Sequence, residues 1–148
     1  MFYAVKLLHI AAAIVWLGGM TFVLGALRPV VMAQLAPPLR LPLMAAVLRR
    51  FFLAVWAGIG VLLLSGGHLL AVTGMKNAPI GAHLMLGIGL LMFAIFGHLY
   101  FGPFRRMKAA VTAADWPEAG RRMAQIHPLV VLNAGLGWLA VAAIYLLR

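Results

Sequence analysis

The chain has no cysteine and only two acidic residues. Without cysteine it can form neither disulfide bonds nor thiolate metal sites nor iron–sulfur clusters. The two acidic residues, Asp115 and Glu118, lie close together in a polar segment rather than in an apolar one. A carboxylate pair acting as general acid and base, and a carboxylate proton relay through a membrane, are therefore excluded.

Charged residues are scarce throughout. Of 148 residues, 66% are hydrophobic and 9% are charged, and the mean hydropathy is +1.07. A soluble domain of this size must cover its surface with polar groups, so the composition indicates a membrane protein. Four apolar runs, at about 3–27, 51–73, 80–102 and 126–147, each approach or exceed the ~20 residues that cross a bilayer as a helix.

These runs predict an all-α integral membrane protein, in which residues 1–148 form a single domain with a bundle of four transmembrane helices. The first run is longer than the core of a signal peptide and no convincing cleavage site follows it, so we expect it to remain as a helix. With four spans, both termini lie on the same side of the membrane.

The cations, which give a formal net charge of +10, are shared unequally among the connections. The second connection has only Lys76. Positive charge gathers on the cytoplasmic side of a membrane, so we expect the first and third connections inside and both termini outside. Such loops can contact anionic lipid headgroups, whereas the lack of an aromatic stacking platform argues against nucleic acid. The cations of these two connections are Arg28, Arg40, Arg49, Arg50, Arg105, Arg106, Lys108, Arg121 and Arg122.

Proline and aspartate give further predictions for the two basic connections. Three prolines within residues 37–42 predict that no helix runs through the first connection, which is then flexible or re-entrant. In the third connection, Asp115 is placed to cap a short helix whose first turn holds Pro117 and Glu118.

Five histidines lie in or beside the apolar runs, at two depths. His9, His68 and His83 lie toward the end with the termini, and His98 and His127 lie toward the other end. A ligating side chain within a membrane is costly, so this pattern indicates a function. Imidazole is a common ligand for haem iron and for copper. Each histidine has a structural alternative, because one close to a helix end can sit among the lipid headgroups.

One stripe of the third run carries two of these histidines. His83, Gly87, Leu90, Ala94 and His98 follow one another at helical spacing, which places both imidazoles on one face, ~22 Å apart. Two b-type haems stacked across a bilayer need such a helix, with small residues that leave room for the macrocycle. The stripe therefore predicts a site for one or two haem b groups.

A haem held by two imidazoles needs a partner histidine at each depth. His127 is the only candidate partner for His98. At the other depth, His83 can pair with His68 or with His9 across adjacent helices, and the sequence leaves that choice open.

Each apolar run also contains short motifs that can be compared with known families. They are Lys6-Leu7-Leu8-His9-Ile10 with Trp16-Leu17-Gly18-Gly19, Arg49-Arg50-Phe51 leading to Leu64-Ser65-Gly66, His83-Leu84-Met85-Leu86 through His98-Leu99-Tyr100, and Asn133-Ala134-Gly135-Leu136-Gly137. Together they resemble the copper-resistance protein D (CopD) membrane family. A related group, the HemJ-type protoporphyrinogen oxidases, has the same first-helix histidine and binds haem b, which implies that His9 is an axial ligand. That group has a lysine where Met85 stands here, which argues against protoporphyrinogen oxidation.

Two functions from different classes follow. The first is a haem b protein, a haem-dependent membrane oxidoreductase, that passes electrons from a donor at one face to a quinone or redox protein at the other. The second, implied by the CopD resemblance, is a copper permease of the bacterial inner membrane. Its ligands are His9, His68 and His83 with Met75 or Met85 outside, and His98 and His127 inside. The third, non-catalytic interpretation is a small assembly subunit whose histidines lie at the membrane interface. As partners we expect the lipid bilayer and a second copy of the chain in a homo-oligomer.

Overall fold

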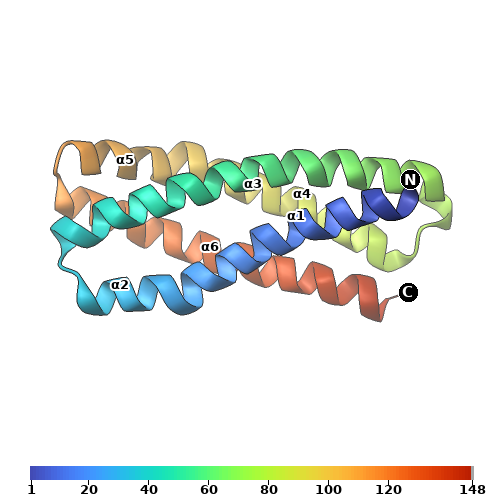
Figure 1. The fold of residues 1–148 in the computed structure, drawn as a ribbon, viewed down its shortest axis with the longest axis horizontal. Coiled ribbons are helices and arrows are strands. Elements are labelled where there is room, and N and C mark those ends of the chain that lie inside the picture. Colours follow the sequence, from blue (N-terminus) through green and yellow to red (C-terminus); the bar gives the residue numbers. More distant parts are fainter. Residues whose placement is uncertain (148) are drawn as a thin grey trace.

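The computed structural model describes residues 1–147, and all regular secondary structure in this range is helical. Four helical stretches are long and apolar enough to cross a membrane: Phe2–Gln34, Pro37–Thr73, Ile80–Thr112 and Trp116–Leu146. Figure 1 shows them as an elongated bundle with the N- and C-termini at the same end. The prediction of an all-α membrane protein with four spanning helices is therefore confirmed.

Two of these stretches contain a π-helical turn. The elements are α1 (Phe2–Phe22), η1 (Val23–Leu27), α2 (Arg28–Gln34), α3 (Pro37–Thr73), η2 (Met75–Asn77), α4 (Ile80–Leu99), η3 (Tyr100–Phe104), α5 (Arg105–Thr112) and α6 (Trp116–Leu146). Pro29 follows the π turn η1, and Pro103 lies within the π turn η3. Proline has no N–H to offer to the preceding turn, and a local π turn accommodates that loss while the helix continues.

The first connection differs from the prediction, because it is a two-residue link and not a long loop. Only Leu35 and Ala36 separate α2 from α3, which begins at Pro37. Proline is favoured in the first turn of a helix, where its missing N–H would have no partner and its fixed φ fits. Pro42 lies inside α3 without ending it.

The predicted aspartate cap is confirmed. The backbone N–H of Glu118 donates to Asp115 Oδ1 over 3.1 Å. The capped helix is not short, however: it is α6 itself, which continues from Trp116 to Leu146 and contains Pro128. The helices thus extend past the apolar runs at one end of the bundle.

The helices pack in two long pairs, α1 with α3 and α4 with α6, and α1 also contacts α6. Aromatic rings fill the space between α1, α3 and α4. Trp16 stacks on Phe93 with centroids 5.6 Å apart, and Phe52 meets Phe104 edge-on at 4.8 Å. Between α4 and α6, Asn133 Nδ2 donates to the carbonyl oxygen of Met92 over 3.2 Å.

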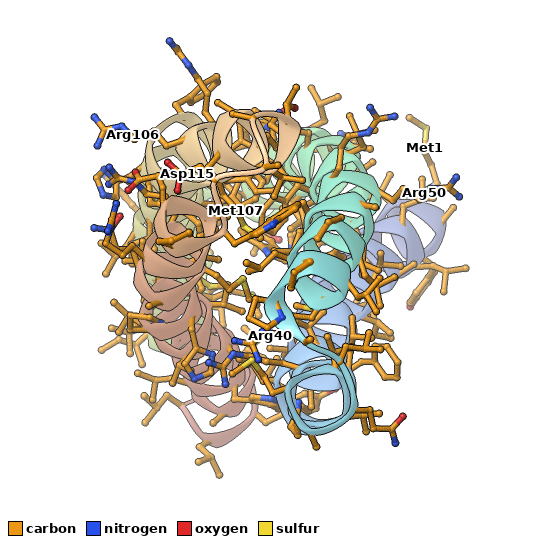
Figure 2. All side chains as sticks on the ribbon, turned by 90° about the vertical axis from the view of Figure 1, so that its left-hand side faces the viewer. Met1, Arg40, Arg50, Arg106, Met107 and Asp115 are labelled. Carbon is orange, nitrogen blue, oxygen red and sulfur yellow. The ribbon has the colours of Figure 1, made fainter. Side chains whose placement is uncertain are left out.

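The two ends of the bundle differ in charge. The end with both termini and η2 is called the terminal end below, and the end with α2 and α5 is called the basic end (Figure 1). Figure 2 looks along the bundle from the basic end, where Arg106 and Arg50 project away from the bundle axis. Near the basic end, Glu118 bridges Arg121 and Arg122 over 2.6 Å to each.

Candidate functional site

His9 lies on α1 and turns its imidazole toward α3. Its Nδ1 atom is 2.8 Å from Ser65 Oγ, and Ser65 is buried. The Ser65 hydroxyl also lies 2.5 Å from the carbonyl oxygen of Val61, to which it donates. A hydroxyl has only one hydrogen, so Ser65 Oγ then accepts a hydrogen bond from the Nδ1–H of His9. The neutral imidazole in this tautomer keeps its lone pair on Nε2, the state in which histidine binds a metal ion.

A glycine makes room for this imidazole. A Cβ on Gly66 would lie 3.3 Å from His9 Cε1 and 3.7 Å from His9 Nδ1, so a side chain there would require the ring to shift by a few tenths of an ångström. The neighbouring Gly67 has open space at the same position. Of this pair, the first glycine is the one that packs closely against the His9 ring.

His68 lies near this contact. It follows Ser65 by three residues on α3, which places it on the same side of the helix and about 4.5 Å further along the axis. Its side chain is half-buried. Because His9 contacts Ser65, the packing of α1 on α3 places His9 and His68 about one helical turn apart along α3. The copper alternative of the sequence analysis includes both residues, whereas its haem pairs do not combine them.

His83 belongs to a different part of the terminal end. It is exposed on α4, and α4 packs there against α6. The backbone N–H of Gly81 donates to the carbonyl oxygen of Leu147 over 3.0 Å. Among the described residues, no group of three or more His, Cys, Asp or Glu side chains could hold a metal ion. The three histidines expected at this depth are therefore not assembled into one cluster.

The histidine stripe of α4 faces away from the bundle. His83, Gly87, Leu90, Ala94 and His98 are all exposed in the single chain. The buried face of α4 is formed instead by Gly81, Met92, Phe96 and Leu99. Helical spacing shows which residues share a face but not which face points inward, and a transmembrane helix is apolar on every side. The predicted stacking of two haems along an interior stripe is therefore not supported.

His98 and His127 do not face each other. His98 lines a groove between α4 and α6 whose α6 residues include Arg122 and Gln125. At ~100° per residue, His127 lies on roughly the opposite side of α6 from these two residues. Its Nδ1 atom is buried without a hydrogen-bond partner in the described chain, and Arg28 interacts with it electrostatically. The described chain has no hydrogen bond between the two imidazoles, so the inner histidine pair stays a prediction. Arg28 near His127, and the two arginines that line the groove of His98, disfavour a bound cation there.

Sequence reasoning missed Ser65, whose side chain makes the only side-chain hydrogen bond to a histidine among residues 1–147. A signal was present, because Ser65 is the sole serine and lies within a long apolar run. A hydroxyl buried in a membrane helix needs a partner, and it normally finds one in its own helix or in a neighbour. The sequence alone does not show that this partner is His9, because the contact depends on the packing of α1 on α3.

A family model described as copper resistance protein D (CopD) matches residues 45–147. The chain belongs to the CopD family. The match covers most of α3 and everything after it, including Ser65 and His68, while His9 precedes it. No curated protein and no solved structure matches the chain. Together with four apolar helices, the family identifies a multi-pass membrane protein related to copper resistance.

Proposed function

We propose that this CopD-family protein moves copper ions across the membrane and that His9 and His68 bind them near the terminal end. The observation that carries the proposal is the contact between His9 Nδ1 and Ser65 Oγ. It fixes the ring and leaves Nε2 as the atom with a free lone pair. A second-layer hydrogen bond of this kind is the usual support of a metal-binding histidine.

His68 is the second ligand in this proposal. Imidazole nitrogens and thioether sulfurs suit copper, and Cu(I) is stable with few ligands. Two imidazoles on neighbouring helices can therefore hold the ion without the carboxylates and thiolates that the membrane-spanning part of the chain lacks. Neutral ligands also leave the ion mobile, because no fixed negative charge retains it.

Buried methionines offer soft ligands further along the bundle. Five of the nine methionines are buried. Thioethers bind Cu(I) without losing a proton, so they can take part in transfer inside a membrane. The buried methionines are Met20, Met44, Met92, Met107 and Met123.

The charge distribution supports an orientation. Because cations gather at the basic end, we propose that this end faces the cytoplasm, that both termini face outward, and that residues 1–148 act as one domain in a bacterial inner membrane. Copper would then be bound first from the outer side. His98 and His127 are not part of the copper route in this proposal, because arginines lie beside both.

Copper flux in proteoliposomes tests the proposal. Purified protein is reconstituted with a Cu(I)-sensitive dye inside the vesicles, and flux is compared for the native chain, His9→Ala and His83→Ala. Loss of a ligand should reduce flux by at least tenfold, whereas His83→Ala, on the exposed face of α4, should keep it. Equal flux in the native chain and His9→Ala would contradict the proposal. So would a b-type absorption band with equimolar iron in a protein that moves no copper.

A further inference from the structure

The groove beside His98 has a chemistry that copper transport does not use. It lies between the α4–η3 segment and α6, toward the basic end, and encloses about 480 Å³. Its lining residues are His98, Gly102, Pro103, Arg106, Arg122, Gln125, Pro128 and Leu129. Three of the polar ones, His98, Arg106 and Gln125, are exposed, so the groove is open to the outside of the bundle.

The polar side chains of the groove offer donors. The side chain of Arg106 makes no hydrogen bond or ion pair within residues 1–147. Arg122 is held in place, because its Nε donates to Glu118 Oε1 over 2.6 Å and its Nη1 donates to Gln125 Oε1 over 3.0 Å. The second of these bonds occupies the amide oxygen of Gln125 and leaves its NH₂ group to donate. An anion with several oxygen acceptors would satisfy this set.

The charge of the groove remains positive after its internal pairing. Glu118 is shared between Arg121 and Arg122, so one carboxylate offsets two guanidinium groups. Arg106, on the opposite wall, has no carboxylate partner in the described chain. A cation would be repelled here, whereas a phosphate would gain charge-assisted hydrogen bonds from guanidinium groups, which suit its geometry.

The groove also has an apolar wall, formed by Pro103, Pro128 and Leu129. It lies where the long apolar part of α4 passes into the arginines of α5. A ligand with a phosphate at one end and a hydrocarbon chain at the other fits this transition. The apolar wall would face the upper part of an acyl chain, and the donors would face the headgroup.

We propose that this groove is a binding site for the phosphate of an anionic phospholipid. Arg106 contacts the phosphate directly, and Arg122, oriented by Glu118 and Gln125, completes the cationic wall. The inference does not depend on copper transport, because it uses neither His9 nor His68. It gives His98 a role as a hydrogen-bonding group at the headgroup in place of a metal ligand.

Lipid binding to the purified protein tests this proposal. The protein is delipidated in detergent, its fold is checked by thermal unfolding, and binding of phosphatidylglycerol and phosphatidylcholine is measured by native mass spectrometry. The variants are Arg106→Gln and the matched control Arg105→Gln. Arg105 is the exposed neighbour of Arg106 with the same charge, and it does not line the groove.

The native chain should prefer phosphatidylglycerol to phosphatidylcholine. Arg106→Gln should weaken phosphatidylglycerol binding by about fivefold, as expected for the loss of one cation near an anionic headgroup. Arg105→Gln should stay within twofold of the native chain, and Arg106→Lys should recover part of the affinity. Equal losses of phosphatidylglycerol affinity in the two glutamine variants would show that binding depends on the general surface charge, and would overturn the proposal. Equal binding of the two lipids would overturn it too, and displacement by inorganic phosphate alone would overturn the assignment to a lipid.

Discussion

Replacement of Ser65 by alanine should weaken copper binding while leaving the fold almost unchanged. The substitution removes the oxygen that lies 2.8 Å from His9 Nδ1. It does not break α3, because the backbone N–H of residue 65 remains and only the extra bond from the side chain to Val61 is lost. The Nδ1–H of His9 loses its acceptor, so the imidazole is free to rotate or to change tautomer.

The size of the effect follows from that geometry. Loss of an outer hydrogen-bond partner of a metal-binding histidine typically lowers metal affinity by about 10- to 100-fold. We expect the lower end, about tenfold, because His9 is only half-buried and water can partly replace the hydroxyl. The free energy of unfolding should change by about 1 kcal/mol or less, as for one side-chain hydrogen bond.

The assay is a competition between the detergent-solubilised protein and a Cu(I) chelator under reducing conditions. The matched control is Thr21→Val, since Thr21 Oγ1 also donates to a carbonyl four residues earlier, that of Leu17, over 2.8 Å, but contacts no histidine. Thr21→Val should bind copper as the native chain does. The reasoning is refuted if His9→Ala abolishes binding but Ser65→Ala does not weaken it, or if the two hydroxyl variants lose affinity equally.

Four substitutions and one control, Gly87→Ala, test the packing and the backbone strain, each by thermal or denaturant unfolding in detergent. Gly81→Ala should destabilise the bundle by about 2 kcal/mol or more, because the new Cβ would overlap the Ala143 carbonyl and lie 2.8 Å from Leu147 O. The control Gly87→Ala should not destabilise it, since a Cβ there would meet open space. Phe52→Ala should cost about 3 kcal/mol or more, since it is buried among several rings. Ala114→Gly should stabilise by about 1 kcal/mol, as φ there is 52°. Asn133→Ala should cost about 0.6 kcal/mol, and a loss above 2 kcal/mol would contradict that estimate.

The four spanning helices could be predicted because a run of about 20 apolar residues has few other stable forms. The residues at which these helices begin and end near the basic end could not be predicted. Three prolines within residues 37–42 were interpreted as a break, but Pro37 begins a helix and Pro42 is tolerated inside it. The meaning of a proline depends on whether its position needs an N–H donor, and that depends on where the helix starts. Asp115 was predictable because its cap is a local interaction with Glu118.

The candidate site was only partly predictable from the sequence. The depth of each histidine follows from its position in an apolar run, but the direction of its side chain does not. In a soluble helix the polar face marks the outside, whereas α4 is apolar on all sides, so nothing in its sequence shows that His83 and His98 are exposed. The contact between His9 and Ser65 joins residues 56 positions apart. It exists because α1 packs on α3, and the sequence alone does not predict which helices pack against each other.

The unequal charges of the two ends give the histidines different chemistry. At the basic end, Arg28 interacts electrostatically with His127, and Arg106 and Arg122 line the same groove as His98, so both imidazoles lie in positively charged surroundings. Such an environment favours anions over copper. At the terminal end, His9 is held by a neutral hydroxyl, and the loop nearby has a single lysine. A cation can therefore be bound between helices at the terminal end, while the basic end is suited to hold the protein against anionic lipid. The charge asymmetry from which we propose the orientation of the chain thus also separates the proposed copper site from the proposed phosphate site.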